Sequence, residues 1–218
     1  MTLKSFMFIA QLQMIIFAIG ALICFIKYRI KDFYIKILGF ALAISVAADF
    51  SSGILHGLKI NVNYGSSVYG LVSFPLISLI YYYVLGEKNK KLYLVVNIAY
   101  LTFGLVNMLF IQRSTINTYT LIIKSIIFIL FSLYYFYWLL KELPTSQLQR
   151  LPMFWINSAY IIYFSGNLFL FVFTSYLVNV LNSDLLVYWS LHNILGIIEG
   201  FMIIVALWLD LQNIKSPS

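Results

Sequence analysis

Charged side chains are scarce in this sequence. They make up 10% of the 218 residues, whereas a soluble domain averages about 25%, and 62% of the residues are hydrophobic. This composition excludes an ordinary water-soluble fold. Cysteine is scarcer still: Cys24 is the only one, which excludes an intramolecular disulfide and a cysteine-based metal motif. We expect Cys24 to be a small packing residue within the first apolar run.

Seven long apolar runs occupy most of the chain and are separated by short polar breaks. A helix that crosses a bilayer needs about 20 predominantly apolar residues. We therefore predict an all-α fold, a single seven-transmembrane helix bundle over residues 1–218, located in the cell membrane. The predicted spans cover about residues 5–27, 33–58, 67–85, 92–111, 118–140, 153–181 and 186–209.

Lysine and arginine are distributed unevenly between the breaks. The even-numbered breaks hold only Lys59 and Arg113, whereas the odd-numbered breaks hold Lys27, Arg29, Lys31, Lys88, Lys90, Lys91, Lys141 and Arg150. Since cytoplasmic loops are enriched in positive residues, we predict an N-terminus outside and a cytoplasmic C-terminus. The net charge of +7 is then a topology signal, and we expect no nucleic-acid partner.

Ionisable residues inside the predicted spans are few. His56 and His192 are the only two histidines, and Asp49 and Glu199 are the only carboxylates in the spans, because the other acids fall at predicted loops or helix ends: Asp32, Glu87, Glu142, Asp184 and Asp210. An ionisable group in hydrocarbon is costly and normally faces the protein interior, so these four residues form a candidate functional site. Lys124, near the start of the fifth span, is expected to snorkel to the headgroups.

The spacing of the four residues predicts how they meet. Asp49 and His56 are seven residues apart, as are His192 and Glu199, so each pair shares one helical face. In the predicted orientation both histidines lie toward the outer side and both carboxylates lie about two turns deeper. If the second and seventh spans are neighbours, two imidazoles face each other above two carboxylates.

Three interpretations of this cluster stay open. In the first, His56, His192, Asp49 and Glu199 hold a divalent metal, for which zinc or iron suits nitrogen and carboxylate ligands. In the second, they form an internal hydrogen-bond network in which one carboxyl group is protonated. In the third, they face different neighbours and only stabilise helix contacts through polar pairing.

Further polar residues accompany the four. Tyr163 and Asn167 lie on one stripe of the sixth span, Ser52 lies on the second span, and Asn193 lies on the seventh. They predict a cavity between the second, sixth and seventh spans with a polar outer half. A cavity of that kind is suited to bind a small ligand.

Two family resemblances carry functional expectations. The runs LPMFWINSAYIIYFSGNLFLFVF and YWSLHNILGIIEG resemble the seven-helix membrane modules of certain bacterial sensor histidine kinases. The resemblance implies a sensory role, in which the outer half samples a ligand and the cytoplasmic ends relay the signal. Because the sequence runs only to DLQNIKSPS after the seventh span, we expect the signal to pass to a separate protein.

A second resemblance is to the seven-helix zinc hydrolases that include alkaline ceramidases. It is carried by Ser52 and His56, four residues apart, together with His192. It implies zinc that activates water, with Ser52 or a carboxylate assisting proton transfer. The sequence departs from that family at Gly196, where a second histidine is expected, and in the third span, which has no aspartate, so Asp49 and Glu199 would have to serve as ligands.

These observations lead to one leading hypothesis and two alternatives. We expect a receptor-like or sensory module in the lipid bilayer, with an intramembrane polar site for a small molecule, a lipid or a metal. The first alternative is a zinc-dependent hydrolase acting on a lipid amide or ester. The second is a proton-coupled transporter, because paired buried carboxyl groups can carry protons. We expect no retinal, because the seventh span has no lysine to form a Schiff base.

Overall fold

The computed structural model describes residues 2–26, 28–58, 63–85, 90–112, 117–143, 147–179 and 185–215. Within these ranges the structure is helical and contains seven helices long and apolar enough to cross a membrane, which confirms the all-α, seven-helix prediction. Their bounds are α1 Leu3–Phe25, α2 Phe33–Gly57, α3 Asn63–Leu85, α4 Lys90–Val106, α5 Thr118–Glu142, α6 Pro152–Asn179 and α7 Leu185–Lys215. Short helical segments follow α1, α4 and α5: η1 (Tyr28–Ile30), the π-helical turn η3 (Asn107–Ile111) and η4 (Leu148–Arg150).

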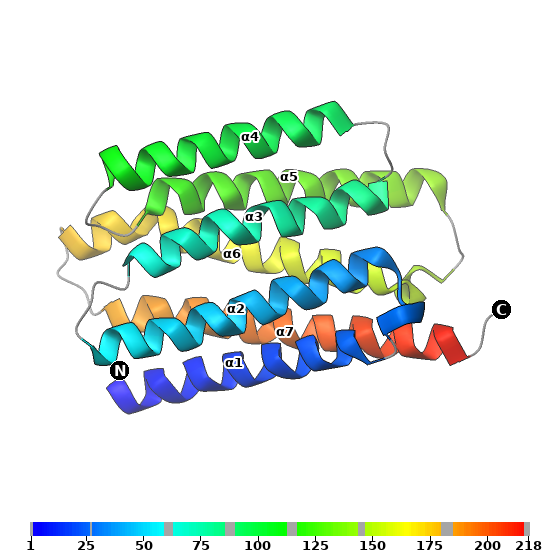
Figure 1. Ribbon diagram of the computed structural model, residues 1–218, viewed down its shortest axis with the longest axis horizontal. Helices are drawn as coiled ribbons and strands as arrows, with labels where there is room; N and C mark the ends of the chain where they lie inside the picture. The colour runs from blue at the N-terminus through cyan, green and yellow to red at the C-terminus, as the bar shows by residue number, and fades with distance from the viewer. Residues whose placement is uncertain are drawn as a thin grey trace.

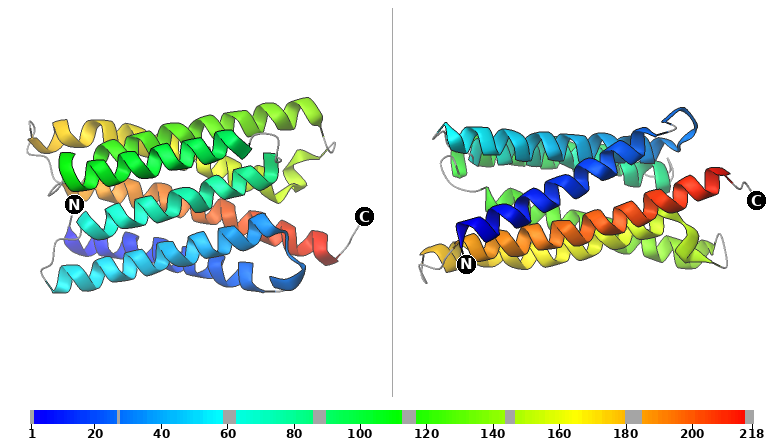
Figure 2. Two further views of the ribbon diagram at one scale, coloured as in Figure 1. Left: turned by 45° about the horizontal axis from the view of Figure 1, so that its top comes forward. Right: turned by 90° about the horizontal axis from the view of Figure 1, so that it is seen from below.

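Six of the helices form a closed ring, and α4 lies outside it. Around the ring, α1 packs on α2, α2 on α3, α3 on α5, α5 on α6, α6 on α7, and α7 again on α1. The remaining helix, α4, lies against α3 and α5 at one edge of the bundle (Figure 1). Figure 2 shows α1 lying across both α2 and α7. The ring therefore closes through α1, which packs on both α2 and α7, so the second and seventh spans are not adjacent in the ring as the expected site requires.

Glycine allows α1 to approach α7 closely. A Cβ atom at Gly196 would collide with the side chain of Gln13, and one at Gly200 would lie 2.5 Å from Ile16 and 3.1 Å from Phe17. The two glycines are four residues apart, the spacing that lets membrane helices bring their backbones together. This contact fixes the position of α7 in the ring, and with it the positions of the polar residues on its inner face.

Cys24 occupies the corresponding contact between α1 and α2. Its side chain is fully buried and free, and a Cβ atom at Gly39 would lie 2.7 Å from the Cys24 Cβ atom. The expectation of a small packing residue is thus confirmed. No larger side chain fits here without moving the two helices apart.

The seventh helix is longer than predicted, and this changes the place of Asp210. Asp210 is predicted at a helix end, but α7 continues to Lys215, and Asp210 is buried within it. Its carboxylate forms an ion pair with Lys31, which is also buried and follows η1. A buried carboxylate needs such a partner, and the connection between α1 and α2 supplies it.

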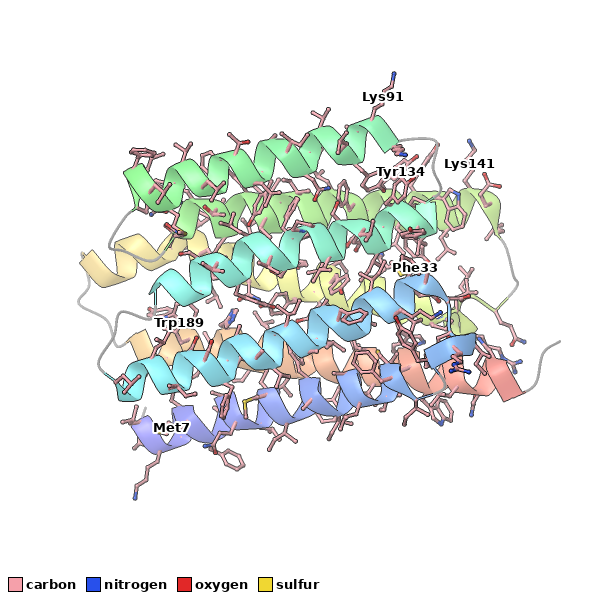
Figure 3. The ribbon with its side chains drawn as sticks, viewed as in Figure 1. Met7, Phe33, Lys91, Tyr134, Lys141 and Trp189 are labelled. Atoms are coloured by element: carbon pink, nitrogen blue, oxygen red, sulfur yellow. The ribbon has the colours of Figure 1, made fainter. Side chains whose placement is uncertain are left out.

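The two ends of the bundle differ in charge. Figure 3 shows Lys91 and Lys141 at one end and Trp189 at the other. The helix bounds place Arg29, Lys31, Lys90 and Arg150 at the end that carries Lys91 and Lys141. The direction in which the bundle crosses the membrane stays a prediction based on this asymmetry.

Candidate functional site

The inner face of α7 carries a polar stripe along its length. His192 is half-buried, Glu199 is 8% exposed, and Asp210 lies three turns beyond Glu199 on the same face. The seven residues that separate His192 from Glu199 form two turns of one continuous helix, Leu185–Lys215. His192 and Glu199 therefore project from one rigid element toward the other helices of the ring.

His192 meets two of the polar residues expected on the sixth span. Its Nδ1 lies 2.5 Å from Asn167 Oδ1, while the Asn167 amide nitrogen donates to the backbone carbonyl of Tyr163 at 2.9 Å. The amide oxygen is thus the acceptor, and the imidazole proton is on Nδ1. Aromatic rings of Tyr163, Phe171 and Trp189 lie within 6.0 Å of the imidazole centre. These contacts hold the imidazole in one orientation.

Lys124 lies in the core of the bundle, which contradicts the expectation that it snorkels. Its side chain is 7% exposed, and its Nζ donates to Ser73 Oγ on α3 at 2.7 Å. The ammonium group also lies 5.3 Å from the ring centre of Tyr69 and 6.0 Å from that of Phe164. Hydrogen bonding and two aromatic faces stabilise the amine inside the ring, so it does not extend to the headgroups.

The sequence contains a signal that would have located Lys124. Asn117, Thr120 and Lys124 recur at helical spacing, and all three side chains are buried in the structure. A lysine that continues a polar stripe shares the buried face of that stripe, whereas a snorkelling lysine lies among lipid-facing residues.

Glu199 is a buried carboxylate that is free to accept hydrogen bonds from a ligand. Among the side chains that the structure describes, it has no hydrogen-bond partner and no direct ion pair. It lies within electrostatic range of the Lys124 ammonium group and of the side chains of Tyr69, Tyr160 and Tyr163. A buried carboxylate surrounded by polar groups that it does not directly bond has acceptor capacity to spare.

Asp49 lies on the helix face that looks across the bundle, but it is accessible. One turn before it, Ser45 is buried and accepts a hydrogen bond from the Tyr69 hydroxyl at 3.2 Å. Asp49 itself is exposed and lies within electrostatic range of Tyr69 of α3 and Tyr163 of α6. Because α2 ends at Gly57 and α7 begins at Leu185, Asp49 lies nearer that end of the bundle than Glu199 does, not at the equal depth expected.

The other candidate residues on α2 and α7 differ in how far they are buried. Ser52 is half-buried, with its hydroxyl oxygen 4.0 Å from the position of a Cβ atom on Gly65, so it faces the start of α3. Asn193 is 9% exposed, next to His192. The side chain of His56 lies outside the described residues. Among those described, no three His, Cys, Asp or Glu side chains gather as a metal site, and the proposed metal set of His56, His192, Asp49 and Glu199 stays a prediction.

A pocket opens between α3, α5 and α7 at the end of the bundle that carries Trp189. It is lined by Ser66, Ser67, Gly70, Asn117, Thr120, Leu121 and Trp189. Three residues further along the same helices come Ser73, Lys124 and His192, one turn deeper on the same faces. The pocket therefore leads toward the buried lysine. It involves α3 and α5, whereas the predicted cavity lies between the second, sixth and seventh spans.

A hydrogen-bond network fixes one wall of this pocket. The Asn107 amide nitrogen, at the start of η3, donates to Asn117 at 3.3 Å and to Thr120 at 2.9 Å. Asn117 in turn donates to Ser67 Oγ of α3 at 2.5 Å. The wall is held by four residues from three segments, so its polar groups are set in place before any ligand arrives.

Comparisons with protein-family models, curated protein sequences and solved structures find no match to this chain. The resemblances to sensor modules and zinc hydrolases therefore stay predictions, and the case for a function depends on the site itself.

Proposed function

We propose that this chain is an integral membrane protein with a receptor-like, sensory function, whose ligand is a small molecule bound within the helix bundle. The observation that carries the proposal is the buried Lys124 ammonium group beneath the pocket between α3, α5 and α7. Ionisable residues inside membrane bundles mark ligand and ion sites, because their burial is too costly to persist without a use.

The arrangement of α7 supports a sensory role. One end of this helix contributes Trp189 to the pocket wall, and its middle contributes Glu199 to the polar interior. Its other end carries Asp210, which is paired with Lys31 in the connection between α1 and α2. A ligand that changes the interaction of Lys124 with Glu199 acts on the same rigid helix that ends at this ion pair. In the orientation predicted from lysine and arginine, that end is cytoplasmic, where a separate signalling protein would receive the change.

A proton-coupled transporter is the second candidate. It is favoured by Glu199 and Lys124, a buried acid and a buried base that lie within electrostatic range of each other but form no direct ion pair among the described residues. A transporter would carry its ligand across liposomes, and Glu199→Gln would abolish that flux. A sensor would bind the ligand with no flux in either protein.

Analysis of the purified protein tests whether a ligand binds. Protein in lipid nanodiscs is denatured, and its extract is compared by mass spectrometry with that of Lys124→Met and of Lys91→Met, an exposed lysine at the far end of the bundle. We expect a small molecule that is retained by the wild type and Lys91→Met and lost from Lys124→Met. A molecule retained equally by all three proteins would contradict binding at Lys124. The same conclusion would follow if no compound of a soluble metabolite library changed the thermal midpoint of the wild-type protein.

A further inference from the structure

The Lys124 ammonium group beneath the pocket has N–H donors with no described hydrogen-bond acceptor. An ammonium group has three N–H donors, and the described contacts of Lys124 comprise one hydrogen bond, to Ser73, and the two aromatic faces. The Lys124 ammonium group therefore has donor capacity for an acceptor that enters from the pocket. A carboxylate is the acceptor that forms the strongest hydrogen bonds with such a group.

Acceptors are available on the other side of the same tyrosine. Lys124 lies over the ring of Tyr69, and the hydroxyl of that tyrosine reaches Ser45 on α2, one turn from Asp49. Glu199 is more than nine-tenths buried and has no hydrogen-bond partner among the described side chains. One cation thus lies against the ring of Tyr69, and two carboxylates lie within electrostatic range of the same side chain, with acceptor capacity that matches an ammonium group.

These charges discriminate between classes of ligand. A simple anion would pair with Lys124 but add negative charge near two carboxylates. A simple cation would pair with the carboxylates but meet the Lys124 ammonium group. A molecule that carries both charges supplies an acceptor for the Lys124 ammonium group and a donor for the carboxylates, so that neither its own charges nor those of the site are buried without an opposite partner.

We propose that the pocket above Lys124 binds a small zwitterion of the α-amino-acid class, with its carboxylate on the Lys124 ammonium group and its ammonium group toward Asp49 and Glu199. The Leu121 and Trp189 side chains in the pocket wall provide apolar surface for the remainder of the molecule. This inference rests on the proposed ligand-binding function and names the chemical class of its ligand.

A panel of matched compounds tests the proposal. The probes are the twenty α-amino acids, each at millimolar concentration, together with the amine and the acid that correspond to each amino acid that binds; for leucine these are 3-methylbutylamine, which lacks the carboxylate, and 4-methylpentanoate, which lacks the ammonium group. The thermal midpoint of the protein in nanodiscs is measured with each. We expect at least one amino acid to raise the midpoint by several degrees, and the analogues of that amino acid lacking either charge to bind about 10- to 100-fold more weakly, the range for a lost charge-assisted hydrogen bond.

Variants locate the binding. Lys124→Met and Glu199→Gln should each remove the midpoint shift, whereas Lys91→Met and Asp32→Asn, exposed charges at the opposite end, should retain it. Because a core variant can fail to fold, Trp189→Phe provides a second measurement: binding should change the tryptophan fluorescence of the wild type and not that of this variant.

The outcomes separate the ligand class from the function. If the amine or the acid binds as tightly as its amino acid, in a manner that needs Lys124, the zwitterion is wrong and the ligand site stands. If no amino acid shifts the midpoint while a co-purified molecule of another class is retained through Lys124, the zwitterion is likewise wrong. If nothing binds and Lys124→Met behaves as the wild type in every assay, the proposed function falls together with this inference.

Discussion

Lys31 and Asp210 form a buried ion pair that ties the connection between α1 and α2 to the far end of α7. The two residues are 179 positions apart in the chain, and both are at most 5% exposed. The pair joins the α1–α2 connection to the last helix of the ring at the end opposite the pocket.

Removal of one partner of this pair should destabilise the protein strongly. Asp210→Asn leaves the Lys31 charge buried without a counter-charge, and we expect a loss of about 3–5 kcal/mol in the free energy of unfolding. The double variant Lys31→Met with Asp210→Leu should recover most of this loss, because no charge is then buried. Denaturant unfolding in detergent measures both. Equal stability of Asp210→Asn and the wild type would show that the pair does not form.

The hydroxyl of Tyr81 connects three helices, and its loss should also be measurable. It donates to Asn157 Oδ1 on α6 and lies 2.8 Å from Ser132 Oγ on α5, both of which are buried. Tyr81→Phe leaves these two groups without this partner, so we expect a loss of about 1–3 kcal/mol in the free energy of unfolding. The matched control is Tyr83→Phe, which removes a hydroxyl from an exposed tyrosine on the same helix and should have little effect. Equal effects of the two variants would contradict the network.

The close contact between α1 and α7 predicts a difference between two glycines. Gly200→Ala places a methyl group 2.5 Å from Ile16, and we expect the resulting overpacking to cost about 1–3 kcal/mol in the free energy of unfolding. Gly53→Ala in α2 meets no described atom within 4 Å and should be neutral or stabilising by up to about 1 kcal/mol, since alanine favours helix. Thermal unfolding of both variants checks the contrast, and a stable Gly200→Ala protein would mean that α1 and α7 are further apart.

The sequence predicted the helices well because apolar runs and polar breaks act locally. It also identified His192 and Glu199 as sharing a face, since helical periodicity decides that within one helix. Contacts between residues of different helices were harder to predict from the sequence. The contact of His192 with Asn167 depends on how α6 and α7 slide past each other, a register that is set by details such as the fit of Leu195 against Gly166.

The sequence-based predictions were wrong mainly about where a helix ends and how deeply a charged residue is buried. The apolar run stops near Asp210 and so predicts a helix end there, but the ion pair with Lys31 allows the buried helix to continue. The position of Lys124 in the first two turns of its span predicts that it reaches the headgroups, but Ser73 and two aromatic rings hold it inside the bundle. In both cases a partner distant in the sequence holds the charged group in place, and only for Lys124 does a local pattern, the polar stripe with Asn117 and Thr120, indicate the buried position.

The predicted direction of the bundle across the membrane can be tested on a single helix. Tyr119 and Lys141 lie near opposite ends of α5, and both side chains are exposed. In a Cys24→Ser background, a membrane-impermeant maleimide applied to intact cells should label Tyr119→Cys and should label Lys141→Cys only after lysis. The reason is that the end rich in lysine and arginine is retained in the cytoplasm.

The opposite labelling pattern would have a definite consequence for the site. The pocket above Lys124 opens at the Tyr119 end of α5, since Asn117 and Thr120 line it. Labelling of Lys141→Cys on intact cells would therefore make this a pocket that takes its ligand from the cytoplasm, and the Lys31–Asp210 pair would lie at the outer surface. A sensor of extracellular ligands requires the first pattern, so the maleimide experiment decides which compartment supplies the ligand before its identity is known.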